Sequence, residues 1–332
     1  MAETSPPIPE NRSRSTAIML QFDQSRFLPI DDLVKKKNAS KTSISVVIPT
    51  LNEAATIGEI VLSAKKSLME DALLVDEIIV MDSRSTDSTM EIARDAGARA
   101  LSIDEIAYFP EITTGKGIAI WKSLFAARGD IIVCIDADIV DFKTHFIYGL
   151  IGPFLENETT IFAKAYYDRP LTIHDKTFEN YGGRVTEILV RPMLSAFVPE
   201  LAKIFQPLSG EYAFRRGPLE KVPFSSGYGV EIGLIFDIYK KYGLETFAQV
   251  NMGTRRHRNR PVQELGIMAF GILQTLFRKL ENTGALRLAG PLLDSMISQG
   301  PNGPKQTVVR EFELPPKALF SETLLKTQEG QP

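Results

Sequence analysis

The sequence predicts an α/β fold built on a mainly parallel sheet. Short apolar runs alternate with longer amphipathic segments between residues 44 and 135. Strands separated by helices of that length pair in parallel through right-handed crossovers. Three of the apolar runs also end in polar clusters, as expected where a ligand binds beyond the carboxyl ends of parallel strands. We therefore expect one open sheet with a binding site along one edge.

The first part of the chain is expected to lead into this sheet through a short helix. Residues 1–16 are polar and carry several prolines, so we expect no fixed structure there. Apolar residues then recur at helical spacing over residues 27–37. The elements expected next are strands at 44–48, 77–81, 98–101 and 131–135, and helices at about 54–69, 86–96 and 116–127.

Beyond residue 138 the alternation weakens. The tail from residue 299 carries several prolines and glycines and is expected to be extended or mobile. These patterns divide the chain at about residues 1–40, 41–140, 141–298 and 299–332. The elements expected after residue 138 are helices at about 143–155, after 183, at 229–239 and from 262, with strands at 161–166, within 206–214 and at 246–251.

Composition excludes several classes of protein. The 332 residues include 38 Lys and Arg against 41 Asp and Glu, which offers no overall attraction for nucleic acid or anionic membrane. No stretch approaches the roughly 20 apolar residues that cross a bilayer, and the N-terminus has no apolar signal region. We therefore expect a cytoplasmic protein. Cys134 lies inside an apolar run and is expected to pack in the core rather than act as a nucleophile.

Two carboxylates, Asp136 and Asp138, follow the strand predicted at 131–135. Carboxylates around one small residue suit Mg²⁺ or Mn²⁺, hard cations that bind through one or two carboxylates plus substrate phosphates. Such triplets also occur in solvated turns. The companion clusters at two other strand ends favour a metal-bound diphosphate as the ligand.

Those two clusters are candidates for contacts with a nucleotide. Residues 49–53 follow the strand at 44–48, and Glu53 at a strand-to-helix junction can accept hydrogen bonds from ribose hydroxyls or a base. Residues 82–87 follow the strand at 77–81, where Asp82 is placed as a carboxylate that contacts a base or ribose. The same residues also fit a turn and a helix cap.

Glycines mark two further candidate anion sites. Gly115-Lys116-Gly117 precedes a helix, so its amides and ammonium could approach a diphosphate, although the spacing of a P-loop is missing. Residues 182–187, Gly-Gly-Arg-Val-Thr-Glu, combine a glycine turn with an arginine and a hydroxyl. This combination fits a phosphate or carboxylate receptor, or a helix start with a surface arginine.

The histidines differ in their surroundings. His257 lies in the basic segment 255–260, where it could complete a metal site or contact phosphate. His145 and His174 have no partner cluster in the sequence and are expected to be structural or exposed.

Taken together, the strand-end clusters resemble those of GT-A glycosyltransferases. The later motifs at 182–187, 206–212, 227–233 and 257–261 resemble those of the glucosyl-3-phosphoglycerate synthases and the closely related mannosyl-3-phosphoglycerate synthases. The likeness covers about residues 27–280. It implies a Rossmann-like nucleotide-sugar-binding half before residue 140 and a helix-rich acceptor-binding half after it.

The resemblance implies a reaction as well. A hexose would move from a nucleotide diphosphate sugar to the 2-hydroxyl of 3-phosphoglycerate, with anomeric configuration retained and Mg²⁺ or Mn²⁺ required. UDP-glucose is the first choice of donor and GDP-mannose the second. Arg84 stands where relatives can have glycine, so its cation either lies beside the expected nucleotide pocket or points outward. A homodimer, and a product that serves as a compatible solute or polysaccharide precursor, also follow from the resemblance.

The resemblance further assigns roles to residues. The expected metal ligands are Asp136, Asp138 and His257, and the residues expected nearest the reacting atoms are Glu231, Asp138 and Tyr228, with Glu231 orienting the acceptor hydroxyl or the donor. The positions that match acceptor contacts are Gly183, Arg184, Thr186, Asn259 and Arg260. Those that match donor contacts are Pro49, Thr50, Leu51, Glu53, Ser83, Lys116 and Asp136.

Two other functions fit parts of the pattern. One is a transferase that acts on a lipid phosphate or a polysaccharide, which the lack of a membrane segment and the Gly-Gly-Arg motif disfavour. The other is a non-catalytic sensor of nucleotide sugars that kept the donor pocket.

Overall fold

The computed structural model describes residues 18–106, 115–168, 171–173, 176–178, 183–255, 261–300 and 303–320. Within them an eight-stranded sheet has the order β1-β11-β6-β9-β5-β2-β3-β4. Its neighbours are parallel except where β9 pairs antiparallel with β5 and β6. The mainly parallel sheet is therefore confirmed. Its strands are β1 (Leu20–Asp23), β2 (Ile44–Thr50), β3 (Glu77–Asp82), β4 (Arg99–Ser102), β5 (Ile131–Cys134), β6 (Phe162–Asp168), β9 (Tyr212–Arg215) and β11 (Phe247–Thr254).

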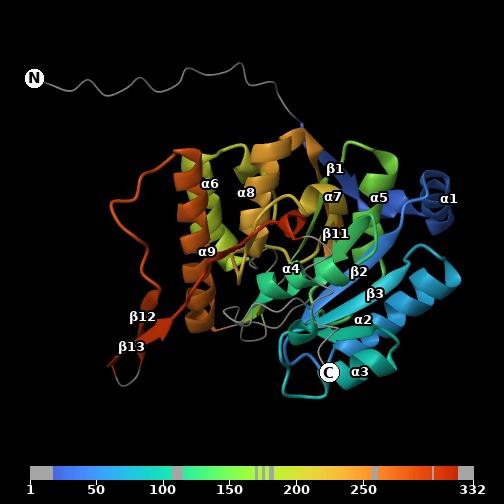
Figure 1. The fold of residues 1–332 in the computed structure, drawn as a ribbon, viewed down its shortest axis with the longest axis horizontal. Coiled ribbons are helices and arrows are strands. Elements are labelled where there is room, and N and C mark those ends of the chain that lie inside the picture. Colours follow the sequence, from blue (N-terminus) through green and yellow to red (C-terminus); the bar gives the residue numbers. More distant parts are fainter. Residues whose placement is uncertain are drawn as a thin grey trace, which may run out of the picture.

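Helices cover both faces of the sheet (Figure 1). Successive strand residues point to opposite faces, so Val46 and Ile48 enter one apolar core while Val47 enters the other. The first core packs against α1 (Ile30–Ser40), α2 (Ile57–Ala64), α3 (Thr89–Asp95) and α5 (His145–Glu156). The second packs against α4 (Lys116–Ala126), α6 (Arg191–Phe197), α7 (Arg216–Leu219), α8 (Val230–Tyr242) and α9 (Val262–Thr283).

The predicted helices and strands are present with shifted ends. Two helical stretches contain π-helical turns, at Lys65–Asp71 after α2 and at Thr186–Val190 before α6. Cys134 is buried in the second core, as expected. His145 is structural, with its Nε2 3.0 Å from the Met252 carbonyl oxygen, and His174 lies outside the described residues.

The C-terminal segment is extended and docked on the body of the protein. The hairpin of β12 (Ser295–Gly300) and β13 (Gly303–Val308) extends from the end of the molecule that carries α9 (Figure 1). Further on, β14 (Glu313–Leu314) pairs antiparallel with β10 (Phe224–Ser225). A separate antiparallel pair is formed by β7 (Leu171–Ile173) and β8 (Lys176–Phe178).

The division of the chain into functional parts at about residues 40, 140 and 298 stays a prediction.

Aromatic contacts hold the end of this tail against α4. The Trp121 indole N–H donates to the Pro315 carbonyl over 2.8 Å. The Phe320 ring meets the rings of Trp121 and Phe125 edge-on, with centroids 5.6 and 5.9 Å away. The tail therefore spans from α9, past β10, to α4.

A buried ion cluster ties the tail to α8 and α9. The Lys279 side chain is 3% exposed and pairs with Asp237 at 2.5 Å and with Glu313. Burial raises the pKa of Asp237 to about 6, although Lys279 acts in the opposite direction. The cluster thus depends on Lys279 to neutralise two carboxylates that are largely withdrawn from water.

Replacing Lys279 by Met should lower the free energy of unfolding by about 2 kcal/mol, because it leaves two partly buried carboxylates without their cation. Urea denaturation measures this change. Lys240→Met is the control, since that exposed ammonium on α8 contacts the Asn282 carbonyl at the surface. Equal losses in the two variants would contradict the role given to Lys279.

Candidate active site

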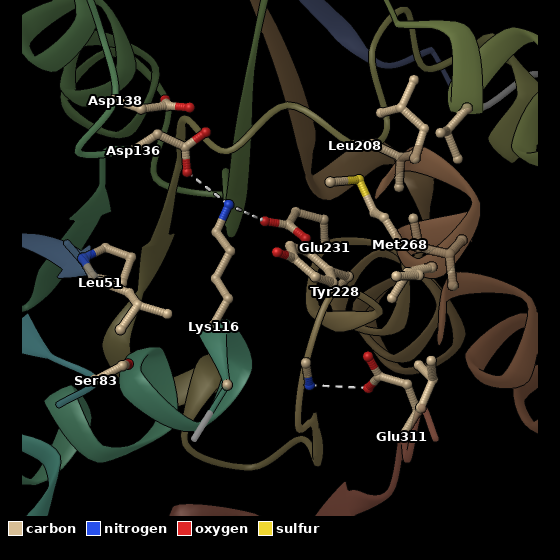
Figure 2. Close-up of a pocket in the computed structure, with 18 of the residues that line it drawn as sticks. Leu51, Ser83, Lys116, Asp136, Asp138, Leu208, Tyr228, Glu231, Met268 and Glu311 are labelled. Carbon is tan, nitrogen blue, oxygen red and sulfur yellow. Dashed lines mark hydrogen bonds and ion pairs between the residues drawn. The ribbon is translucent and has the colours of Figure 1, made fainter. Parts of the chain in front are cut away.

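The residues that the sequence singled out come together around a pocket of about 640 Å³ at the carboxyl ends of the strands (Figure 2). His257, Asn259 and Arg260 lie outside the described residues. Pocket formation by the others agrees with the prediction, while their individual roles stay predictions. The predicted residues that line it are Pro49, Thr50, Leu51, Glu53, Ser83, Lys116, Asp136, Asp138, Gly183, Arg184, Thr186, Tyr228 and Glu231.

The ends of β2 and β3 form one wall of the pocket. The Ser83 amide donates to the Thr50 carbonyl over 2.8 Å, and the Thr50 hydroxyl donates to Asp82 over 3.1 Å. Asp82 also accepts from the amide and hydroxyl of Ser85, and it is not among the described residues that line the pocket. The structure therefore supports the turn interpretation of Asp82 rather than contact with a base or ribose.

Arg84 does not enter the pocket. Its φ of 67° lies in the left-handed region that favours glycine, which explains why a glycine would suit this position. The guanidinium instead donates two hydrogen bonds, of 2.8 and 2.9 Å, to Asp104. Of the two orientations expected for Arg84, the structure has the outward one, because Asp104 holds the guanidinium away from the pocket.

Lys116 is the central cation of the pocket. Its ammonium lies 2.6 Å from Asp136 and 2.7 Å from Glu231 (Figure 2). Burial alone would lower the pKa of Lys116, but the two carboxylates raise it well above its ordinary value. Lys116 is therefore a permanent positive charge between β5 and α8.

A close approach between α4 and β10 places Lys116 there. A Cβ on Gly117 would lie 1.8 Å from the Ser225 carbonyl oxygen, so a side chain cannot be accommodated at this position. The Ile118 amide donates to the Ser226 carbonyl over 3.0 Å. Glycine at 117 thus lets the first turn of α4 dock on the chain that leads to Tyr228 and Glu231.

Arg255 is a second cation, which the sequence analysis missed. It follows β11 directly, is 5% exposed, and contacts Asp138 at 2.8 Å and Asp136 at 3.6 Å. Glu211 lies 2.9 Å away on its inner side and also accepts a hydrogen bond of 2.6 Å from Tyr167. The signal that could have found Arg255 is its place at a strand end, within the basic segment that contains His257.

The carboxylates of Asp136 and Asp138 fit a divalent metal ion. Their side chains are 21% and 32% exposed, so both can be reached from the pocket. Among the described residues no group of three or more His, Cys, Asp or Glu side chains is arranged to hold a metal. Two carboxylates still match Mg²⁺ or Mn²⁺ when substrate phosphates supply the remaining oxygen ligands.

The predicted acceptor motif forms a helix start at the pocket. Gly183 has a φ of 78°, so the chain turns sharply there before the helical segment that contains Arg184. Thr186 in the same turn is 4% exposed. The amides of a helix start, together with an arginine, form a suitable receptor for a phosphate or carboxylate.

Another part of the wall comes from α9 and the C-terminal tail. Apolar residues at helical spacing on α9 are ordinarily attributed to the core, so the sequence did not mark them as pocket residues. The lining residues that sequence reasoning missed are Leu208, Arg255, Leu265, Ile267, Met268, Ile272, Val308, Val309, Arg310 and Glu311.

Comparison with known proteins identifies the family. The model Glycosyl transferase family 2 matches residues 45–202, which indicates a glycosyltransferase. Glucosyl-3-phosphoglycerate synthase from Petrotoga mobilis is 45% identical over 276 residues, covering 83% of this chain and 85% of that protein. The chain therefore belongs to the glucosyl-3-phosphoglycerate synthase family.

Solved structures show the same relationship. Glucosyl-3-phosphoglycerate synthase from Mycobacterium tuberculosis, in complex with Mn²⁺, UDP-glucose and phosphoglyceric acid, matches with a TM-score of 0.77 at 38% identity over 91% of this chain and 98% of that one. The same enzyme is known with Mg²⁺ and UDP. Mannosyl-3-phosphoglycerate synthase from Rubrobacter xylanophilus matches with a TM-score of 0.80 at 35% identity, covering 91% and 96% of the two chains.

None of the helices described here is long and apolar enough to cross a membrane.

Gly210→Ala should impair turnover about 100-fold, since a displacement of about 1 Å can cost that much. A Cβ there would lie between 2.0 and 2.2 Å from the carboxylate atoms of Asp136, so this carboxylate must move. Steady-state kinetics measures the loss. Gly217→Ala is the matched control, because a Cβ at that position meets nothing within 4 Å. Full activity in Gly210→Ala would show that the exact position of Asp136 does not matter.

Proposed function

We propose that this enzyme transfers glucose from UDP-glucose to the 2-hydroxyl of 3-phosphoglycerate, giving glucosyl-3-phosphoglycerate with retained anomeric configuration. One observation carries the proposal: the carboxylates of Asp136 and Asp138, the Lys116 ammonium and the helix start at Arg184 line the same pocket. A metal-bound donor and a phosphorylated acceptor can thus meet there. The M. tuberculosis relative, in complex with Mn²⁺, UDP-glucose and phosphoglyceric acid, supports this assignment.

The donor would lie along the ends of β2, β3 and β5. Pro49, Leu51 and Ser83 line this side of the pocket and would contact the nucleotide. Asp136 and Asp138, with His257, would hold a divalent metal ion, which offsets the negative charge that develops on the leaving UDP. Relatives at 45% identity carry the glucosyl name, which favours UDP-glucose over GDP-mannose.

The acceptor would lie at the helix start after Gly183. The Arg184 guanidinium can bind a phosphate or carboxylate through two parallel hydrogen bonds, and the nearby amides and the Thr186 hydroxyl add donors. Asn259 and Arg260 would complete this receptor. A phosphorylated hydroxy acid such as 3-phosphoglycerate offers two anionic groups that match these donors.

Retention is expected from the resemblance of the motifs to those of the family, and the pairing of the pocket's charges indicates which retaining route fits. Glu231 lies beside Tyr228 (Figure 2) and is ion-paired with Lys116, which weakens it as a nucleophile. We therefore assign Glu231 to orienting a hydroxyl rather than to a covalent glycosyl-enzyme. The acceptor hydroxyl would attack from the face of the leaving diphosphate. The bond from the anomeric carbon to the diphosphate oxygen breaks as the new glycosidic bond forms, and a diphosphate oxygen takes the hydroxyl proton.

Three broader expectations accompany this function. We expect a homodimer that acts in the cytoplasm, and a product that serves as a compatible solute or as a precursor of a polysaccharide. The homodimer and the use of the product rest on the resemblance of the motifs to those of the family, and the cytoplasmic location rests on the composition of the chain.

The direct test incubates the protein with Mg²⁺, 3-phosphoglycerate and either UDP-glucose or GDP-mannose. Mass spectrometry detects the product and NMR gives its anomeric configuration. An α-linked glucosyl product from UDP-glucose is expected. Nucleotide binding without any product would instead favour the sensor, and a β-linked product would contradict retention.

Asp138→Asn should lower metal-dependent turnover by about 100-fold or more, because it removes a charged metal ligand worth several kcal/mol in the transition state. Initial rates across a Mn²⁺ titration measure this effect. Asp141→Asn is the control, since Asp141 is exposed in the same loop and asparagine also tolerates its φ of 57°. If Asp138→Asn kept its rate and its metal dependence, the assignment of the metal site would be wrong.

Arg184→Ala should raise the KM for 3-phosphoglycerate by about tenfold or more, the value of a lost charge-assisted hydrogen bond. The KM for UDP-glucose in the same variant is the internal control and should change little. Initial-rate kinetics with each substrate varied in turn separates the two constants. Unchanged acceptor kinetics would remove Arg184 from the receptor.

A further inference from the structure

Glu311 is a buried carboxylate that none of the roles above uses. It lies on the C-terminal tail just before β14 and is 7% exposed. Its carboxylate accepts hydrogen bonds from the amides of Gly227, over 2.9 Å, and Gly229, over 3.2 Å (Figure 2). These amides flank Tyr228 and immediately precede α8, whose first turn carries Glu231. A distant part of the chain thus caps the helix that carries Glu231 and holds the loop that carries Tyr228.

The capped loop has little room to move. A Cβ on Gly227 would lie 2.4 Å from a Glu311 carboxylate oxygen, and one on Gly229 would lie 2.0 Å from the Thr275 hydroxyl. The loop therefore packs directly on the tail and on α9 through its backbone. The position of the loop therefore depends on the tail and α9, and Glu311 is the charged group of the tail that contacts the loop.

Glu311 is itself fixed from the other side. Its amide donates to the Gln274 side-chain oxygen over 3.0 Å, and Gln274 in turn donates to the Val309 carbonyl over 2.8 Å. The Ser226 amide donates to the Phe312 carbonyl over 2.9 Å. These contacts hold the tail between α9 and the loop. They therefore fix the position of the Glu311 carboxylate relative to the loop amides.

The charge of Glu311 fits a structural partner better than a substrate contact. Burial raises the pKa of this carboxylate, and the amides of Gly227, Gly229 and Tyr228, together with Arg278, act in the opposite direction. A carboxylate would repel a diphosphate or a phosphorylated acid. Backbone amides are the partners that Glu311 satisfies, and they belong to the loop of Tyr228.

We propose that Glu311 is a positioning residue for glycosyl transfer: it caps α8 and thereby fixes Tyr228 and Glu231 relative to Lys116. This inference rests on the proposed function. The tail, through Glu311, is then a working part of the active site. Glu311 lies outside the wall formed by the ends of β2 and β3, so we expect the contacts of that wall with the nucleotide to change little when the cap is lost.

Glu311→Gln tests the proposal, because the carboxamide keeps the size of the side chain but replaces one acceptor oxygen by a donor group. The kcat should fall about tenfold or more, since misplacement of groups at the reacting centre is costly. The KM for UDP-glucose should stay within about twofold of the wild-type value, because the contacts that bind UDP-glucose equally in the ground state and the transition state are unchanged. Equal loss of kcat and nucleotide affinity, or no loss of kcat, would overturn the positioning role.

Lys317→Met is the matched control. Lys317 lies on the same tail and pairs with Glu220 at 3.0 Å, away from the loop of Tyr228. The fluorescence of Trp121, the one tryptophan of the chain, reports whether the tail stays docked, because its indole bonds to Pro315. Unchanged fluorescence in Glu311→Gln, with loss of kcat in that variant and not in Lys317→Met, is expected. The same loss of kcat in Lys317→Met would show a general effect of the tail and overturn the proposal.

Hydrogen–deuterium exchange provides a readout that does not depend on activity. The amides of Gly227 and Gly229 should exchange faster in Glu311→Gln than in the wild type. Their exchange rates in Lys317→Met should equal those of the wild type. If the wild type transferred no glucose, the proposed function would fail while faster exchange would still establish the cap. Unchanged exchange in Glu311→Gln would overturn the cap itself, whatever the wild type transfers.

Discussion

The ammonium of Lys116, held between Asp136 and Glu231, is the contact on which the rest of the site depends. It joins the carboxyl end of β5 to α4 and α8, three elements from separate parts of the chain. Without this cation two carboxylates would face each other in a largely buried place, which is costly because both cannot ionise freely. Arg255 does the same between Asp138 and Glu211. The pocket is thus a set of carboxylates balanced by cations.

Close backbone packing makes this arrangement of charges possible. Gly117 lets α4 approach the carbonyl of Ser225, and Gly210 leaves room for the carboxylate of Asp136. Behind α8, the amides of the loop at Tyr228 rest on Glu311 from the tail. The predicted active-site groups are therefore held in place by close backbone packing and by contacts behind them, as positioning by proximity and orientation requires.

Local patterns in the sequence were enough to predict much of this. An apolar run followed by acidic residues identifies β5 and its edge, and the same pattern predicts β2 and β3. What depends on contacts between distant residues could not be read in this way. The antiparallel insertion of β9 between β5 and β6 is one case, and the partnership of Arg255 with Glu211 is another. The docking of Glu311 on the loop before α8 also has no local signature, because that tail is rich in prolines and glycines.

The measurement that tests the account most directly is a crystal structure of the protein with Mn²⁺ and UDP-glucose, with the metal located by its anomalous scattering. The account predicts a Mn²⁺ peak bound by Asp136 and Asp138, with the diphosphate within hydrogen-bonding distance of Lys116 and the nucleotide along Leu51 and Ser83. A metal bound elsewhere, or a nucleotide away from the ends of β2 and β3, would contradict it.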